Sequence, residues 1–339
     1  MTAFTSTNIR EIGFDVPAEP GMSVTDISTP ALIIDLDQFE RNMATMRSFA
    51  RNAGIGLRAH AKTHKSIDIA RYQVSAGGAH GICCQKVSEA EVMARGGISD
   101  ILISNQVVDP AKIRRLAGLS VVANILVCVD DIENLAELSS AAREHDTVIQ
   151  CLVELDCGAG RCGVAPGEAA LKLAEAIQRS YGLVFRGIQA YQGAAQHVVD
   201  YRQRKQLIAE AVESVRATLK LLASRGIQCD IVTGAGTGSY PIETESGVYT
   251  ELQCGSYIFM DAHYQTLHDR HGQPVSTFSN ALYVLTSIVS SASPGRAICD
   301  AGLKAHSIDS GMPVIAGEET LKSVSYTHLT LPTMIIRCR

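Results

Sequence analysis

The chain has 339 residues, of which 46% are hydrophobic and 19% are charged, and its formal net charge is −5. This composition is typical of a globular protein with one large and one smaller domain, and the mildly acidic charge gives no electrostatic reason to expect nucleic acid as a partner. The sequence contains no apolar run of membrane-spanning length and no apolar signal-peptide core near its N-terminus. These features predict a cytoplasmic protein that does not bind membranes.

Short β-branched runs alternate with helix-like stretches over the first two thirds of the chain. The runs begin at residues 31, 56, 81, 100, 124, 148, 183 and 230. Parallel strands that alternate with helices in this number are typical of a (β/α)8 barrel. The pattern therefore predicts an α/β fold with a TIM-type barrel over residues 28–260, and a doubly wound open sheet is the alternative.

The pattern changes after residue 255. Strand-like runs at residues 257–264, 281–293, 296–307 and 312–317 follow one another without helical segments between them. We expect a partial C-terminal β domain over residues 261–321, with residues 1–27 packed against it.

Residues 58–65 (RAHAKTHK) place a lysine between two histidines. If the segment is a strand, His60, Lys62 and His64 share one face, because side chains alternate with a period of two. A partly buried lysine has a lowered pKa and becomes a nucleophile. A surface lysine is the alternative interpretation.

Residues 233–239 (TGAGTGS) follow the run at residue 230. They lack the third glycine of a dinucleotide fingerprint and the lysine of a P-loop. Bare backbone N–H groups in such a loop can bind an anion, and barrels often hold a phosphate after their last strands. A plain tight turn is the alternative. A lysine nucleophile and a phosphate loop in one barrel point to pyridoxal 5'-phosphate (PLP).

Several segments resemble one enzyme family. They are residues 29–37 (TPALIIDLD), 83–97 (CCQKVSEAEVMARGG), 153–164 (VELDCGAGRCGV), 187–197 (GIQAYQGAAQH), 251–264 (ELQCGSYIFMDAHY) and 300–311 (DAGLKAHSIDSG), together with the lysine and glycine segments above. The chain is similar to the D-threonine aldolase and D-serine dehydratase family, whose barrel is of the alanine-racemase N-terminal kind.

The resemblance implies roles for individual residues. Lys62 matches the lysine that binds PLP covalently, and Arg161 matches an arginine beside the pyridine nitrogen. His60 is expected near the reacting hydroxyl. The remaining cofactor-binding residues implied are Gln85, Tyr191, Thr233, Gly236, Thr237, Gly238, Ser256 and Tyr257.

The resemblance also implies a divalent cation (Mn, Mg or Zn), held by a C-terminal motif of the form GHCDP. No such motif occurs here. Residues 325–333 (SYTHLTLPT) resemble a translated sequencing-adapter tail, so residues 322–339 are expected to be artefactual and the metal ligands absent. This chain is therefore expected to hold PLP but to be impaired in cleavage of the substrate. His328, the histidine in that tail, is not expected to be a ligand.

The implied function is PLP-dependent, metal-assisted cleavage of 3-hydroxy-D-aspartate to glycine and glyoxylate by a homodimer. Two alternatives use the same cofactor and the same site residues. One is a D-threonine aldolase, and the other is a D-serine or 3-hydroxy-D-aspartate dehydratase, which differs by releasing ammonia. The alternative of a different class is a PLP-binding protein without turnover that serves cofactor homeostasis.

Overall fold

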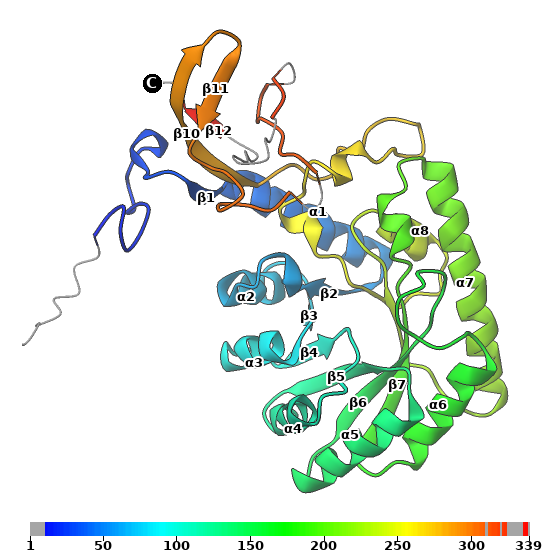
Figure 1. Cartoon of the computed structure of the whole chain (residues 1–339). Coiled ribbons are helices and arrows are strands. Elements are labelled where there is room, and N and C mark those ends of the chain that lie inside the picture. The colour runs from blue at the N-terminus through cyan, green and yellow to red at the C-terminus, as the bar shows by residue number, and fades with distance from the viewer. Residues whose placement is uncertain (1–10, 309–310, 319–320, 324–334, 338–339) are drawn as a thin grey trace, which may run out of the picture. The chain divides into compact units, whose positions relative to one another are not determined.

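The computed structural model of the protein describes residues 11–308, 311–318, 321–323 and 335–337. The chain divides into two compact units (Figure 1). The larger unit comprises residues 40–258 and 264–278, and the smaller one comprises residues 1–39, 259–263 and 279–339. None of the helices in the described part has the length and apolar composition needed to span a membrane.

The larger unit is a closed barrel of parallel strands with the helices arranged around it (Figure 1). Each strand pairs with the next one along the chain, and the last pairs with the first. The strands are β2 (Gly56–His60), β3 (Gly81–Cys84), β4 (Asp100–Ile103), β5 (Asn124–Val129), β6 (Ile149–Glu154), β7 (Leu183–Ala190), β8 (Ile231–Gly234) and β9 (Glu251–Leu252). The predicted eight-stranded barrel is confirmed.

The predicted set of barrel strands was wrong at one position. The run at residue 31 forms β1 (Ala31–Ile34), which pairs antiparallel with β10 (Leu282–Ser293) in the smaller unit. The strand that closes the barrel is β9, which has two residues. A two-residue strand leaves no periodicity in the sequence, whereas the apolar run at residue 31 suits either kind of sheet.

The helices begin and end at recognisable caps. Ser66, Asp109 and Asp200 accept hydrogen bonds from the first turns of α2, α4 and α7. The α-helices are α1 (Leu36–Ala53), α2 (Ile67–Ser75), α3 (Val87–Arg95), α4 (Pro110–Leu119), α5 (Ile132–Glu144), α6 (Glu168–Arg179), α7 (Tyr201–Ser224) and α8 (Tyr240–Glu245). Short 3₁₀ helices are η1 (Val24–Asp26), η2 (Ala61–Thr63), η3 (Ala194–His197), η4 (Ser256–Ile258) and η5 (Tyr264–Thr266).

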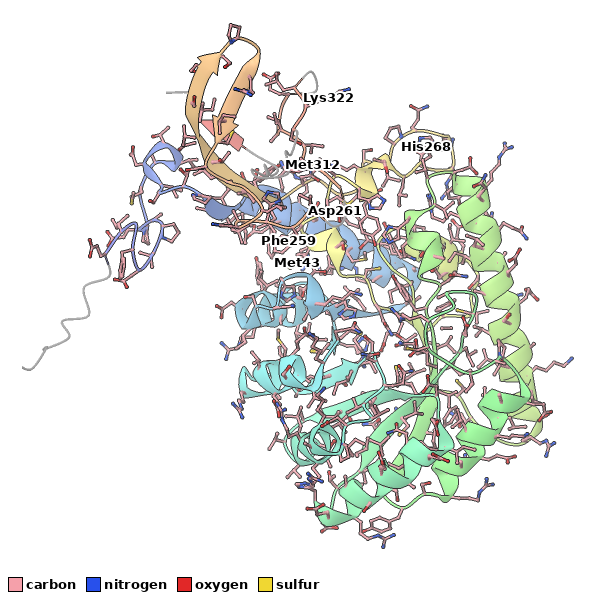
Figure 2. The ribbon with its side chains drawn as sticks, viewed as in Figure 1. Met43, Phe259, Asp261, His268, Met312 and Lys322 are labelled. Atoms are coloured by element: carbon pink, nitrogen blue, oxygen red, sulfur yellow. The ribbon has the colours of Figure 1, made fainter. Side chains whose placement is uncertain are left out.

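Apolar side chains fill the spaces beneath the barrel helices and part of the barrel interior. Met43 of α1, labelled in Figure 2, is 5% exposed. Inside the barrel, the buried cluster consists of Cys83, Leu102, Leu126, Cys128 and Leu152. The loop that ends at His268 (Figure 2) is tied to α7, because the Arg204 guanidinium donates to the carbonyl of His268 at 2.5 Å.

The smaller unit contains a sheet in which β10 pairs with β1, with β11 (Arg296–Cys299) and, in parallel, with β12 (Ile335–Arg337). The strand predicted at 281–293 is confirmed, and the one predicted at 296–307 is confirmed over Arg296–Cys299 only. The run at 257–264 is not a strand, because η4 occupies its start, and residues 311–318 form no strand. Most of the suspected artefactual tail, including His328, lies outside the described residues.

Candidate active site

The C-terminal ends of the barrel strands surround a cavity. Polar side chains and glycine backbone form most of its wall. The lining residues are His60, Lys62, Thr63, Gln85, Ser104, Arg161, Gln189, Tyr191, Ala235, Gly236, Thr237, Gln253, Gly255, Ser256 and Tyr264. Active sites of such barrels form at this end of the strands.

Lys62 lies just after the first barrel strand, in the 3₁₀ turn η2. The expected common face of His60, Lys62 and His64 is therefore wrong, because the strand ends at His60 and the chain turns. His64 points elsewhere, with its Nε2 3.1 Å from Oε1 of Gln73, and burial lowers its pKa to about 4. His60 and Lys62 line the cavity and His64 does not.

The sequence predicts a partly buried Lys62, but its side chain is exposed to solvent at the cavity. The cavity walls nevertheless crowd its ammonium group. This desolvation lowers the pKa of Lys62 below its ordinary value, and the positive charge of Arg161 lowers it further. More of the amine is consequently neutral and nucleophilic near neutral pH than in an ordinary lysine.

His60 is 5% exposed and has partners for both ring nitrogens. Its Nδ1 accepts the backbone N–H of Lys62 at 3.4 Å, and its Nε2 lies 3.1 Å from Oγ of Ser104. We infer that the ring hydrogen is on Nε2. Burial, together with the charge of Lys62, lowers the pKa of His60 well below its usual value, so the imidazole is neutral at physiological pH.

Two short segments supply backbone donors to the cavity wall. Within the part of the chain that the structure describes, the N–H groups of Gly236, Thr237, Gly255 and Ser256 donate to no protein acceptor. The first three residues are buried, and buried N–H groups are rarely left without a partner. This pair of segments can therefore bind an anion such as a phosphate group.

The glycines keep these segments close to their surroundings. A Cβ atom at Gly236 would collide with the side-chain amide of Gln196, and one at Gly255 would lie 2.6 Å from Oγ1 of Thr63. Thr237 adds a hydroxyl. Its Oγ1 accepts the N–H of Tyr257 at 3.0 Å, which leaves its O–H free to donate.

Arg161 follows β6 and brings a positive charge to the cavity. Its Nη2 lies 3.5 Å from Oε1 of Glu154, and its guanidinium carbon is 5.6 Å from the ring centroid of Tyr191. Burial raises the pKa of Tyr191 to about 12, so this phenol is neutral.

Eight of the residues expected to be in the site line this cavity, and three do not. Thr233 is buried in the barrel interior and donates to Glu251 at 2.7 Å. The N–H of Gly238 donates to Oε1 of Gln196 at 3.1 Å, and the hydroxyl of Tyr257 accepts from Gln73 at 3.0 Å. These three residues do not line the cavity and bind other residues of the barrel instead. The eight that line it are His60, Lys62, Gln85, Arg161, Tyr191, Gly236, Thr237 and Ser256.

The model of the alanine racemase N-terminal domain matches residues 34–263, which is more than half of the chain. The chain belongs to the alanine racemase N-terminal domain family. A second model, of a putative serine dehydratase domain, matches residues 281–336. The predicted resemblance is confirmed.

Three of the similar proteins are aldolases. The chain is 49% identical to 3-hydroxy-D-aspartate aldolase of Paracoccus denitrificans (strain Pd 1222), over 96% of this chain and 84% of that protein. It is 44% identical to D-threonine aldolase of an Arthrobacter species, over 97% and 85% of the two chains. The solved structure of D-threonine aldolase from Filomicrobium marinum superposes with a TM-score of 0.88 at 44% identity, over 93% of this chain and 85% of that one. The family fold and these relatives imply PLP as the cofactor.

Several residues of this family member's cavity were missed in the sequence. Ser104, Gln189 and Gln253 come from separate strands or from the residues just after them. Gln189 and Gln253 stand in segments that carry the family resemblance, but the resemblance implied no role for either residue. Their common signal is position, since each is a polar residue at the C-terminal end of an apolar run. Tyr264 comes from η5 and has no such signal.

Proposed function

We propose that the chain is a PLP-dependent aldolase that cleaves 3-hydroxy-D-aspartate to glycine and glyoxylate. The observation that carries the proposal is the presence in one cavity of the Lys62 amine and the unpaired N–H groups of Gly236, Thr237, Gly255 and Ser256. PLP has an aldehyde for the first and a phosphate for the second. The 49% identity to a 3-hydroxy-D-aspartate aldolase favours this substrate.

The residues present fit the cofactor. Lys62 would hold the aldehyde carbon, the two glycine segments and the Thr237 hydroxyl would hold the phosphate, and Arg161 and Tyr191 would lie beside the ring. The positively charged guanidinium of Arg161 would disfavour protonation of a pyridine nitrogen next to it. The bound cofactor supplies a sink for the electrons released at the substrate Cα atom.

Lys62 and His60 contribute differently to the reaction. Lys62 would hold the aldehyde carbon of the cofactor, and its amine, which has a lowered pKa, would carry a proton within the cavity when it is free. His60 is neutral and holds the backbone N–H of Lys62 through Nδ1, so it orients the lysine. The substrate loses its β-hydroxyl proton, the Cα–Cβ bond breaks to release glyoxylate, and Cα takes up a proton to give glycine.

The described residues do not fit the divalent cation that the resemblance implies. No group of three or more His, Cys, Asp or Glu side chains among them is arranged to hold a metal ion. We therefore derive no step through a metal. A homodimeric assembly and a cytoplasmic location stay predictions.

The second candidate is D-threonine aldolase activity, which the 44% identity and the TM-score of 0.88 favour. Both aldolases need the same cofactor site and differ in the group on the substrate Cβ atom. The dehydratase alternative rests on a weaker similarity, 29% identity to D-threo-3-hydroxyaspartate dehydratase of Delftia sp. (strain HT23) over 84% of this chain and 74% of that one.

The test is a product assay on the purified chain with PLP. We expect glyoxylate and glycine in equal amounts from 3-hydroxy-D-aspartate, little acetaldehyde from D-threonine, and no ammonia. Lys62→Ala should abolish both the products and the cofactor trapped by borohydride, whereas Lys65→Ala, three residues away on the surface, should retain them. Ammonia with oxaloacetate would identify a dehydratase. Trapped cofactor at Lys62 without any product would identify a binding protein without turnover.

A further inference from the structure

A buried glutamine of η3 contacts the glycine loop that supplies backbone donors to the cavity. Gln196 is 1% exposed and does not itself line the cavity. Its Oε1 accepts the backbone N–H of Gly238 at 3.1 Å. A Cβ atom at Gly236 would collide with the same oxygen, so this glycine is also in close contact with it. One side-chain amide therefore contacts the loop on both sides of Thr237, which lines the cavity.

The orientation of the Gln196 amide is fixed by further hydrogen bonds. Its Nε2 donates to Oγ of Ser239 at 2.5 Å and to the carbonyl oxygen of Gln192 at 3.4 Å. The buried Oγ of Ser239 in turn donates to Oε1 of the buried Glu243 at 2.7 Å. The series thus runs in one direction, from the loop N–H through two side chains to a carboxyl group. A flipped amide would turn its own N–H groups toward the N–H of Gly238, so only one orientation satisfies the series.

Backbone hydrogen bonds close the loop into a turn. The carbonyl oxygen of Gly236 accepts the N–H groups of Ser239 and Tyr240 at 3.1 and 3.0 Å. A turn closed by backbone bonds alone permits a range of torsion angles at its glycines, which have more accessible conformations than other residues. The contacts with Gln196 restrict Gly236 and Gly238, and they therefore set the direction in which the N–H groups of Gly236 and Thr237 point.

The direction of these N–H groups decides how well they bind a phosphate group. A hydrogen bond weakens steeply when its donor angle falls below about 120°, and hydrogen bonds to charged acceptors are the stronger ones. A phosphate group therefore loses more than a neutral hydroxyl group when the donors turn away. Pyridoxal has a hydroxymethyl group where PLP has the phosphate, and both present the same aldehyde to Lys62. A change in the ratio of their affinities consequently reports the donor geometry of the loop.

We propose that Gln196 is a positioning residue for the phosphate of the cofactor, because its amide holds Gly236 and Gly238 and directs the N–H groups of Gly236 and Thr237 into the cavity. Ser239 supports this role, since its hydroxyl accepts from the amide of Gln196. The inference rests on the proposed function only in that a phosphate group binds to this loop. It goes beyond that function because it assigns the preference for PLP over pyridoxal to a side chain outside the cavity wall.

The experiment compares the binding of PLP and of pyridoxal and does not depend on turnover. The full-length chain is freed of bound aldehyde by dialysis against hydroxylamine, and the change in absorbance of each added ligand gives its dissociation constant. Gln196→Leu, which is similar in size but has no amide, should raise the constant for PLP by about tenfold and that for pyridoxal by less than about twofold. Ser239→Ala should act in the same direction by less, because Gln196 keeps its contact with Gly238.

Asn134→Leu is the matched control. Asn134 is a buried amide of α5 that donates to the carbonyl oxygen of Val107 at 2.9 Å and does not line the cavity. Its loss should lower the thermal stability but leave the ratio of the two dissociation constants unchanged. An equal loss of affinity for PLP and pyridoxal in Gln196→Leu would overturn the proposal, because a general structural role affects both ligands alike. If Gln196→Leu does not fold, Ser239→Ala decides, and an unchanged ratio in that variant would refute the role of the amide.

Inorganic phosphate separates this inference from the proposed function, because its binding needs the loop but no amine. Isothermal titration calorimetry should show that the native chain binds phosphate and that Gln196→Leu binds it about tenfold more weakly. A native chain that binds phosphate through Gln196 but yields no glyoxylate would refute the aldolase and leave the inference standing. A native chain that binds no phosphate and does not prefer PLP to pyridoxal would overturn the inference.

Discussion

Oγ of Ser104 lies 3.1 Å from Nε2 of the buried His60 and 3.3 Å from the carbonyl oxygen of Cys84. The hydroxyl thus accepts the imidazole hydrogen and donates its own to the strand backbone. These two hydrogen bonds connect the residue that follows β4 to β3 and to β2 at the edge of the cavity. This arrangement fixes the tautomer of the histidine that holds the backbone of Lys62.

Ser104→Ala should therefore destabilise the protein and loosen His60. A buried N–H that loses its acceptor costs about 1–3 kcal/mol, so we expect a decrease of this size in the free energy of unfolding in urea. The exposed Ser88→Ala is the control and should change it by less than about 0.5 kcal/mol. An unchanged ¹⁵N chemical shift of His60 Nε2 in Ser104→Ala would contradict the hydrogen bond.

Thr237→Val should weaken PLP binding, since the variant keeps the shape of the side chain but loses the hydroxyl. A hydrogen bond to a charged group is worth about 1.5–3 kcal/mol, which corresponds to a loss in affinity of about 10- to 100-fold. Thr237→Ser keeps the hydroxyl and should bind nearly as well as the native chain. Equilibrium dialysis measures both, and an equal loss in the two variants would mean that the methyl group matters instead.

Gly236→Val should weaken PLP binding much more than Cys157→Ala does. A side chain at residue 236 would collide with Gln196 and displace the backbone whose N–H groups face the cavity. Cys157 is buried nearby but does not line the cavity. Similar binding constants for the two variants would favour a plain tight turn over an anion site.

Glu251 should make the stability of the barrel depend on acid pH. Burial alone would raise the pKa of Glu251, but hydrogen bonds from His80 and Arg58 lower it to about 2. The folded pKa lies below the ordinary value of about 4.3, so the stabilisation is complete above that value and is lost as pH falls toward 2. Its size is on the order of 3 kcal/mol.

Glu251→Gln should accordingly lower the free energy of unfolding at pH 7 by a few kcal/mol and flatten its decrease between pH 5 and 2. The control Glu245→Gln breaks an exposed ion pair with Arg270 and should cost less than about 1 kcal/mol. Urea titrations at several pH values measure both variants. An acid dependence that persists in Glu251→Gln would assign it to other carboxylates.

The sequence alone was enough to predict the barrel and most of the cavity lining. Strand runs, helix caps and glycine segments are local features, and the residue types of Lys62, Arg161 and Thr237 suggest chemistry wherever they lie. The resemblance to known motifs then supplied their roles. The C-terminal ends of the parallel strands lie at the same end of the barrel. Residues that follow different strand segments could therefore be predicted to line one cavity.

Only the tertiary structure decided which strands pair and how the polar interior is connected. The run at residue 31 was predicted as a barrel strand, but the two-residue β9 closes the barrel instead. Strand pairing depends on long-range contacts that a local pattern does not encode. Hydrogen bonds link Gln189 to Gln253, Gln253 to Thr233 and Thr233 to Glu251. These residues are far apart in the chain, and such hydrogen bonds between side chains form only once the barrel has closed. The turn after His60, which separates Lys62 from His64, likewise follows from backbone geometry and not from the alternation of residue types.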